Sequence, residues 1–177
     1  MAKEVKSVLV ARDQIKEMCQ RLGAEITADY KDEDIVLICV LRGAVVFLAD
    51  LMRYIERPCE IDFLSVSSYC GTESTGIVKI IKDLDDSIEG RNVIIVEDII
   101  DSGLTLSHLI EMLRVRKPRS IRICTAFNKP NRRKANVKVD YIGMDIPDEF
   151  VVGYGLDYDG QYRNLPDICI LGDREEK

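Results

Sequence analysis

Carboxylates and hydroxyls crowd into one short stretch of this sequence, VIIVEDIIDSGLTL at residues 93–106. Its polar members follow an apolar run and are Glu97, Asp98, Asp101, Ser102, Gly103 and Thr105. Glycine lets a backbone approach a ligand closely, and the amides and hydroxyls that open a helix bind a phosphate monoester. The stretch therefore predicts a phosphate site at residues 101–105. It is not a Walker A loop, because GxxxxGK[ST] occurs nowhere in the sequence.

The two neighbouring carboxylates constrain the ligand further. Glu97 and Asp98 would repel a bound phosphate unless they address a neutral or cationic group. We expect them to meet ribose hydroxyls and a hydrated Mg²⁺, so the predicted ligand is a sugar phosphate. A structural alternative stays open, since acidic residues after a strand often serve as solvated turn or N-cap residues.

The elements that must position this loop follow from the apolar pattern. Apolar runs predict strands at residues 35–40, 61–66, 77–81, 92–96 and 121–126, and amphipathic patterns predict helices at 11–29, 44–55 and 104–116. Strands that alternate with helices indicate an α/β fold with a mainly parallel twisted sheet flanked by helices. Residues 97–103 would then be the loop after a strand, at the sheet edge where such folds bind ligands.

Two parts of the chain depart from that alternation. Residues 61–81 predict a hairpin-like insert, antiparallel and peripheral, around a flexible polar loop at 67–76. Short apolar runs at 139–142, 150–152 and 168–171 predict a small appended subdomain. The 177 residues fit one domain. We expect its core at about 30–145 and a hood built from the N-terminal segment and about 146–177.

Composition narrows the class of protein. A net charge of −6 argues against a general nucleic-acid binder. Lysines and arginines crowd between residues 114 and 138, either as a solvated face or as a field that attracts a polyanionic substrate. Six cysteines without a CxxC spacing predict reduced core thiols rather than a metal site or disulfides. Neither a signal peptide nor an apolar run of ~20 residues is present, which predicts a cytoplasmic protein with no membrane partner.

The run VEDIIDSGLT at residues 96–105 resembles the signature with which type I phosphoribosyltransferases bind phosphoribosyl pyrophosphate (PRPP), in particular the hypoxanthine-guanine branch. LRG at 41–43 resembles the pyrophosphate loop of that family, SSY at 67–69 its mobile catalytic loop, and FVVGYGLDY at 150–158 its purine-binding end. The resemblance spans nearly the whole chain. It implies a purine salvage enzyme that uses Mg²⁺ to transfer the phosphoribosyl group from PRPP to N9 of hypoxanthine or guanine, giving a purine nucleotide (IMP or GMP) and pyrophosphate.

The resemblance also implies a role for individual residues. Catalysis would fall to Asp101, as general base near purine N7, and to Ser68 and Tyr69. The PRPP ribose and 5-phosphate would contact Glu97, Asp98, Ser102, Gly103, Leu104 and Thr105, with Leu104 offering only its backbone N–H. Pyrophosphate would meet Arg42, Gly43 and Arg163, and the purine would meet Lys129, Phe150 and Val151. The Mg²⁺ ligands would be Glu97, Asp98 and Asp157.

Residue chemistry alone leaves blander alternatives for these positions. Phe150 would be a core residue, Lys129 a surface charge and Asp157 a turn residue. Arg42 and Arg163 would each be surface charges. The lone histidine, His108, is given no role by the resemblance.

The chain also departs from the family pattern at two places. Cys70 stands where a glycine is expected, in a loop that is a residue short, and many relatives have lysine at the position of Arg42. A lysine that donates to a 6-oxo group favours 6-oxopurines over adenine. Xanthine as preferred base, or a regulator that keeps the PRPP fold but binds nucleic acid, are the alternative functions. The resemblance implies a homodimer or homotetramer.

Overall fold

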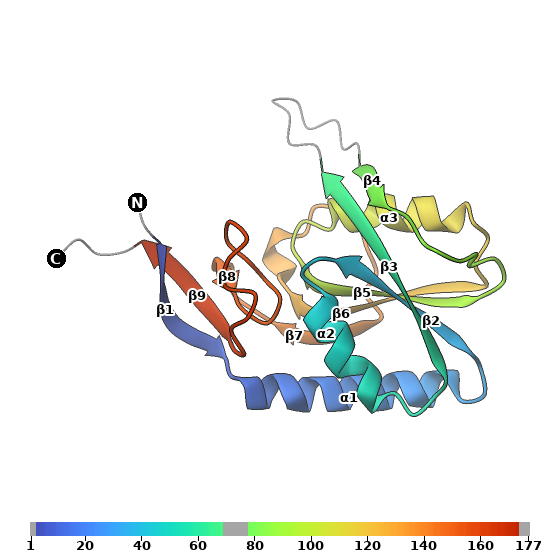
Figure 1. Cartoon of the computed structure of the whole chain (residues 1–177), viewed down its shortest axis with the longest axis horizontal. Helices are drawn as coiled ribbons and strands as arrows, with labels where there is room; N and C mark the ends of the chain where they lie inside the picture. Colours follow the sequence, from blue (N-terminus) through green and yellow to red (C-terminus); the bar gives the residue numbers. More distant parts are fainter. Residues whose placement is uncertain (1–2, 69–77, 174–177) are drawn as a thin grey trace.

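The computed structural model describes residues 3–68 and 78–173, and its central feature is a mainly parallel sheet (Figure 1). Within these residues the sheet has the order β4-β3-β2-β5-β6-β7. Its members are β2 (Ile35–Leu41), β3 (Cys59–Ser68), β4 (Val78–Lys82), β5 (Asn92–Ile100), β6 (Ser120–Asn128) and β7 (Tyr141–Asp145). All neighbouring pairs are parallel except β3 with β4. The predicted fold class is confirmed.

Helices cover both faces of this sheet, which is why its inner strands read as unbroken apolar runs. On one face, Leu37 and Cys39 of β2 pack in a cluster with α1 (Arg12–Tyr30) and α2 (Val45–Leu51). On the other face, Val36 and Ile38 pack in a cluster with α3 (Leu104–Arg114). The buried stripe on α1 recurs at the three- and four-residue spacing predicted: Ile15, Met18, Cys19, Leu22 and Ile26.

The strand order reverses between β2 and β5. From β2 the chain proceeds through α2 to β3 on one side, whereas from β5 it proceeds through α3 to β6 on the other. The loops that leave the carboxyl ends of β2 and β5 therefore diverge and leave a crevice, which is where open α/β sheets bind ligands. Residues 41–43 and 97–105 meet there.

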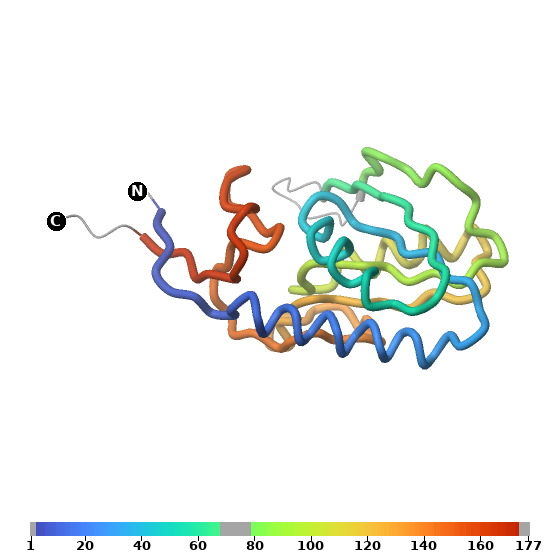
Figure 2. The backbone as a smooth tube through the Cα atoms, turned by 60° about the horizontal axis from the view of Figure 1, so that its bottom comes forward, coloured from blue at the N-terminus to red at the C-terminus, as the bar shows by residue number. Residues whose placement is uncertain are grey.

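A second, antiparallel sheet lies at one end of the molecule (Figures 1 and 2). It has the order β1-β9-β8 and joins β1 (Lys3–Val10), β9 (Ile168–Asp173) and β8 (Val151–Val152). Its strands β1 and β9 are the first and last elements described, and α1 runs from it along the main sheet (Figures 1 and 2). We propose that this sheet and the segment 153–167 form the predicted hood.

Several predicted boundaries are wrong. The strand expected at 92–96 continues to Ile100, so Glu97 and Asp98 lie on β5 and not in a loop. The strand continues because Glu97 pairs with Thr125 and Ile99 with Phe127 of β6, and backbone pairing does not require apolar side chains. The helix expected at 104–116 ends at residue 114, and α2 gives way at residue 52 to a 3₁₀ turn, Met52–Tyr54.

Two strands were also predicted in the wrong place. The strand expected at 61–66 is not peripheral, because β3 pairs in parallel with β2 along seven residue pairs. The predicted antiparallel pairing within the insert is confirmed, since β3 pairs antiparallel with β4, which is the edge strand. The apolar run at 139–142 does not belong to the appended subdomain, because β7 pairs in parallel with β6 and extends the main sheet.

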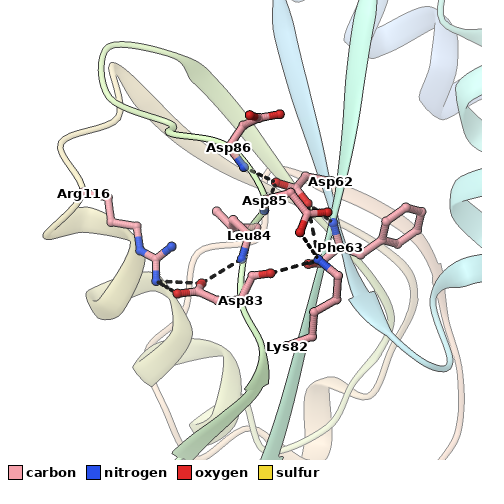
Figure 3. Close-up of polar contacts among 8 residues, drawn as sticks. All are labelled: Asp62, Phe63, Lys82, Asp83, Leu84, Asp85, Asp86 and Arg116. Carbon is pink, nitrogen blue, oxygen red and sulfur yellow. Dashed lines mark hydrogen bonds and ion pairs between the residues drawn. The ribbon is translucent and has the colours of Figure 1, made fainter.

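A buried aspartate holds the segment that follows β4 against β3 (Figure 3). Asp62, only 7% exposed, accepts hydrogen bonds from the backbone N–H groups of Phe63 (2.6 Å), Asp85 (3.0 Å) and Asp86 (3.4 Å). The Lys82 ammonium lies 3.9 Å from the same carboxylate and donates to the carbonyl of Phe63 at 3.2 Å. The cluster therefore fixes the end of β4 onto the sheet.

Candidate active site

Three distant segments touch at the carboxyl edge of the sheet. A Cβ on Gly43 would lie 1.5 Å from Oδ2 of Asp98, and a Cβ on Gly155 would lie 2.1 Å from the carbonyl oxygen of Gly43. The loop after β2, the end of β5 and the segment after β8 are thus in direct contact, and glycine leaves the room for it. The Leu41–Arg42 peptide bond is cis, and the Arg42 side chain is exposed.

The paired carboxylates on β5 are partly buried. Burial, together with the adjacent Asp98, raises the pKa of Glu97 well above its ordinary range. Burial also raises the pKa of Asp98 to about 6, although the backbone N–H of Ile99 (2.6 Å) and the charge of Arg163 oppose the rise. A cation beside the pair would relieve both effects, because it favours the ionised forms.

The donor set fits Mg²⁺ in the manner that this ion prefers. Among residues 3–68 and 78–173, no three Asp, Glu, His or Cys side chains converge closely enough to enclose a metal. Mg²⁺ commonly takes one or two carboxylates and completes its six ligands with substrate oxygens and water. Glu97 and Asp98 could supply such carboxylates.

The predicted phosphate loop leads into α3. Gly103 has φ +77° and precedes the first helical residue, and the Ser102 hydroxyl oxygen accepts the N–H of Leu104 at 3.4 Å. A small cavity of about 140 Å³ opens here, lined among others by Glu97, Asp101, Ser102, Gly103 and Thr105. The first N–H groups of a helix have no helical partner and carry the positive end of its dipole, so the cavity suits an anion.

A larger cavity of about 460 Å³ lies on the other side of Asp101. Among its lining residues are Asp101, Lys129, Phe150, Val151 and Asp157. Asp101 and Ile99 line both cavities, so the general-base candidate stands between the predicted phosphate site and the predicted purine site. The Nε atom of Arg132 lies 2.7 Å from Oδ1 of Asp101.

The blander alternatives for Lys129 and Phe150 are wrong. Lys129 is only 7% exposed and its ammonium donates to the carbonyl of Glu149 at 2.7 Å, whereas Phe150 is 54% exposed. The backbone N–H of Lys129 bonds to the carbonyl of Ile100 (2.9 Å), and this pairing carries the lysine into the cavity beside β5. Phe150 packs edge-on against Tyr158, with ring centroids 5.7 Å apart, and leaves much of its ring open.

Asp157 and Arg163 form an ion pair between the hood and the crevice. Nη2 of Arg163 lies 2.7 Å from Oδ1 of Asp157, and Nη1 donates to the carbonyl of Gly155 at 2.6 Å. The other oxygen of Asp157 accepts the N–H of Gly160 at 2.8 Å, so this residue also serves its turn. A third cavity, of about 550 Å³, lies between α1, α2 and the hood; it shares only Arg163 with the candidate residues and is not centred on the crevice.

The remaining candidates divide into those placed elsewhere and those outside the described residues. Tyr69 and Cys70 fall in the segment 69–77, outside the described residues, and of Ser68 only the backbone is described, paired with Val78. His108 is partly buried on α3 and lines neither crevice cavity. The described cysteines are free, and burial raises the pKa of the Cys19 thiol to about 11 and of Cys39 to about 12, as for inert core thiols.

Sequence reasoning assigned no role to several residues that line or support the crevice, among them Arg132, Arg133, Asp148, Glu149 and Leu156. The basic run at 114–138 was the sequence signal for the two arginines. The sequence left two interpretations of that run open, a solvated face or a positive field that attracts a polyanionic substrate. Arg132 and Arg133 lie at the crevice.

No helix in the two described ranges has the length and apolarity needed to cross a membrane.

Comparisons with known proteins agree with this geometry. Residues 9–159 match the phosphoribosyl transferase domain family. The chain is 52% identical over 172 residues to a hypoxanthine-guanine phosphoribosyltransferase of Bacillus subtilis, covering 97% of this chain and 96% of that protein. A solved hypoxanthine-guanine phosphoribosyltransferase from Bacillus anthracis superposes with a TM-score of 0.92 at 46% identity, covering 97% and 100% of the two chains. A hypoxanthine phosphoribosyltransferase from Staphylococcus aureus gives 0.92 at 50% identity, covering 95% and 92%.

Proposed function

This chain belongs to the phosphoribosyltransferase family, and on that premise we propose that it serves purine salvage. It transfers the 5-phosphoribosyl group of PRPP to N9 of hypoxanthine or guanine and releases pyrophosphate with IMP or GMP. The observation that carries the proposal is the pair of cavities that meet at Asp101, one at the start of α3 and one beside the buried Lys129.

The smaller cavity would hold the 5-phosphate. Backbone N–H groups at the start of α3 and the hydroxyls of Ser102 and Thr105 would supply donors. The N–H of Leu104, which donates to the Ser102 hydroxyl at 3.4 Å, would turn to the phosphate. Glu97 and Asp98 at the end of β5 would address the ribose hydroxyls. Hydroxyls can donate to both carboxylates, which suits an acidic pair of which Glu97 also lines the smaller cavity.

The larger cavity would hold the purine. The Lys129 ammonium has three N–H donors, one of which meets Glu149, and another can reach a 6-oxo oxygen. Adenine presents an amino group at that position, so two donors would face each other, and such mismatches are strongly rejected. The backbone of Val151 would read the ring edge, and the open face of Phe150 would stack on the ring.

Asp101 would accept the N7 proton as N9 attacks the ribose C1. Arg132 holds this carboxylate from one side at 2.7 Å and is itself held by Asp148 at 3.0 Å, which orients the base without enclosing it. A carboxylate at that point can share a proton with the purine only if the ring lies in the cavity that it lines. Asp101 would therefore act on bound purine rather than on free water.

Pyrophosphate would leave toward the loop at residues 41–43. The backbone of Gly43 and the guanidinium groups of Arg42 and Arg163 would receive it, with Ser68 and Tyr69 covering it as the family resemblance implies. Mg²⁺, when bound, would neutralise the developing charge on the leaving group. Glu97 and Asp98 would hold this ion, and Asp157, which here pairs with Arg163, would be a ligand of a second Mg²⁺.

One set of assays tests the whole assignment. The purified protein would be mixed with PRPP, Mg²⁺ and each of hypoxanthine, guanine, xanthine, adenine and uracil, with a metal-free control. Metal-dependent conversion of the first two bases is expected, faster conversion of xanthine would move the assignment within the family, and PRPP binding without any turnover would support a regulator instead. Full single-turnover activity of Asp101→Asn would refute the assignment of Asp101 as the general base.

Two further measurements test the remaining proposals. Sedimentation would test the proposed homodimer or homotetramer, and cell fractionation would test the proposed cytoplasmic location.

A further inference from the structure

The backbone of residues 129–135 runs beside the phosphate loop and is bonded to it at successive points. The N–H of Lys129 donates to the carbonyl of Ile100 at 2.9 Å, and the N–H groups of Lys134 and Ala135 both donate to the carbonyl of Ser102, at 2.9 and 3.0 Å. In a trans peptide the C=O and the following N–H point in opposite directions. Because the Ser102 carbonyl is held toward residues 134–135, the N–H of Gly103, a residue that lines the small cavity, points away from them.

Arg133 lies in the middle of this segment and directly behind the loop. A Cβ on Gly103 would lie 3.2 Å from both Cδ and Nη1 of Arg133, so the guanidinium is in contact with the glycine that opens α3. Nη2 donates to the side-chain oxygen of Asn128, whose own amide donates to Asp145 at 2.6 Å. This chain of contacts fixes the plane of the guanidinium.

The Nη1 end of the same guanidinium lacks a hydrogen-bond acceptor among the described residues. Nη1 of Arg133 is buried and has no hydrogen-bond partner among the described residues. Burial lowers the pKa of Arg133, and the charge of Asp101 opposes that effect. A buried donor without a partner costs free energy, and an anion on the other side of the loop would recover part of that cost.

The charged groups around Arg133 agree with this view. Asp101 is the carboxylate whose charge favours that of Arg133, and Asp101 also pairs with Arg132, at 2.7 Å. Asp145 is reached only through Asn128. The side chain of Lys134, the next cation along the chain, is exposed. The charge of Arg133 is therefore available to a phosphate at the start of α3.

We propose that Arg133 is a positioning residue for the 5-phosphate, acting through the loop at Gly103 and favouring the dianionic form of the phosphate. This inference rests on the proposed function, since it takes the cavity at the start of α3 to be the 5-phosphate site. It concerns phosphate binding and not the chemistry at the base.

Binding of GMP and of guanosine to Arg133→Met would test the proposal. Methionine keeps the apolar stem and removes the charge. GMP is expected to bind about tenfold more weakly, a change of about 1.4 kcal/mol, while guanosine affinity changes less than about twofold. Phosphorus NMR of bound GMP should show the second phosphate pKa raised by about one unit, because a nearby cation had favoured the dianion. Arg133→Lys should restore most of both effects.

Arg119→Met is the matched control, because Arg119 is exposed at the opposite end of β6 and pairs only loosely with Glu33, at 3.6 Å. It should change neither readout. Equal losses for GMP and guanosine, or an unmoved phosphate pKa in a folded Arg133→Met protein, would show that Arg133 has a structural role only. Parent protein that binds no GMP would overturn the proposed function as well, whereas GMP binding that Arg133→Met leaves intact would overturn only this inference.

Discussion

A single methyl group added at Gly43 should lower activity strongly while changing the stability of the fold little. A Cβ at this position would lie 1.5 Å from Oδ2 and 2.7 Å from Cγ of Asp98, whereas ordinary contacts begin near 3.4 Å. The carboxylate of Asp98 would therefore have to move by about 2 Å. Gly43 is not in the left-handed region, so alanine adds a steric clash and no backbone strain.

The expected cost falls mainly on catalysis. Moving the carboxylate breaks its 2.6 Å bond with the N–H of Ile99, but it also relieves part of the burial that raises the pKa of Asp98. We expect these effects nearly to cancel, with a stability change of about 1 kcal/mol or less. A misplacement of about 1 Å in a reacting complex can cost roughly a hundredfold, so kcat/KM for PRPP should fall by about a hundredfold or more.

The assay is steady-state kinetics with PRPP varied at saturating hypoxanthine, beside urea unfolding of the same preparation. Gly90→Ala is the control, because Gly90 has φ +71° and nothing within 4 Å of an added Cβ. That variant should lose about 1 kcal/mol of stability to backbone strain and keep its activity. If Gly43→Ala kept kcat/KM for PRPP within threefold of the parent, the proposed role of Asp98 at the ribose would be refuted.

Three further predictions follow from buried charges. Lys129→Met should raise KM for hypoxanthine about tenfold to a hundredfold while KM for PRPP changes little, because the proposed buried donor to the 6-oxo group is lost. Steady-state kinetics with each substrate varied in turn would measure both KM values. A parallel rise of the two values would contradict this prediction. Burial raises the pKa of Asp98 to about 6, above its unfolded value near 4, so the folded metal-free protein holds this proton more tightly and loses stability as pH rises through about 6. Asp98→Asn should therefore exceed the parent by about 1–2 kcal/mol in urea unfolding with chelator at pH 7.5, and this advantage should shrink as pH falls toward 4; an advantage independent of pH would count against the shift. Asp62→Ala should cost about 2–3 kcal/mol because it leaves three backbone N–H groups without their acceptor, and the exposed Asp86→Ala should cost little in the same melt.

The sequence by itself determined what depends on neighbours along the chain. Residues 96–105 form the end of a strand, a turn and the start of a helix, so the order of side chains in that run already predicted a phosphate site beside an acidic pair. Apolar periodicity predicted α1, α3 and most strands of the main sheet, because a buried stripe recurs with the period of its element. The class of fold followed from the alternation of these elements.

Only the tertiary structure decided what depends on segments distant in the chain. Lys129 is buried and Phe150 is open because of what packs across from them, and no local pattern reports that. The extension of β5 through Glu97 and Asp98 depends on pairing with β6, whose backbone hydrogen bonds continue past the end of the apolar run. The contact of Gly43 with Asp98, and of Arg133 with Gly103, arises where loops from different strands meet at one sheet edge, and that meeting is a property of strand order rather than of either loop.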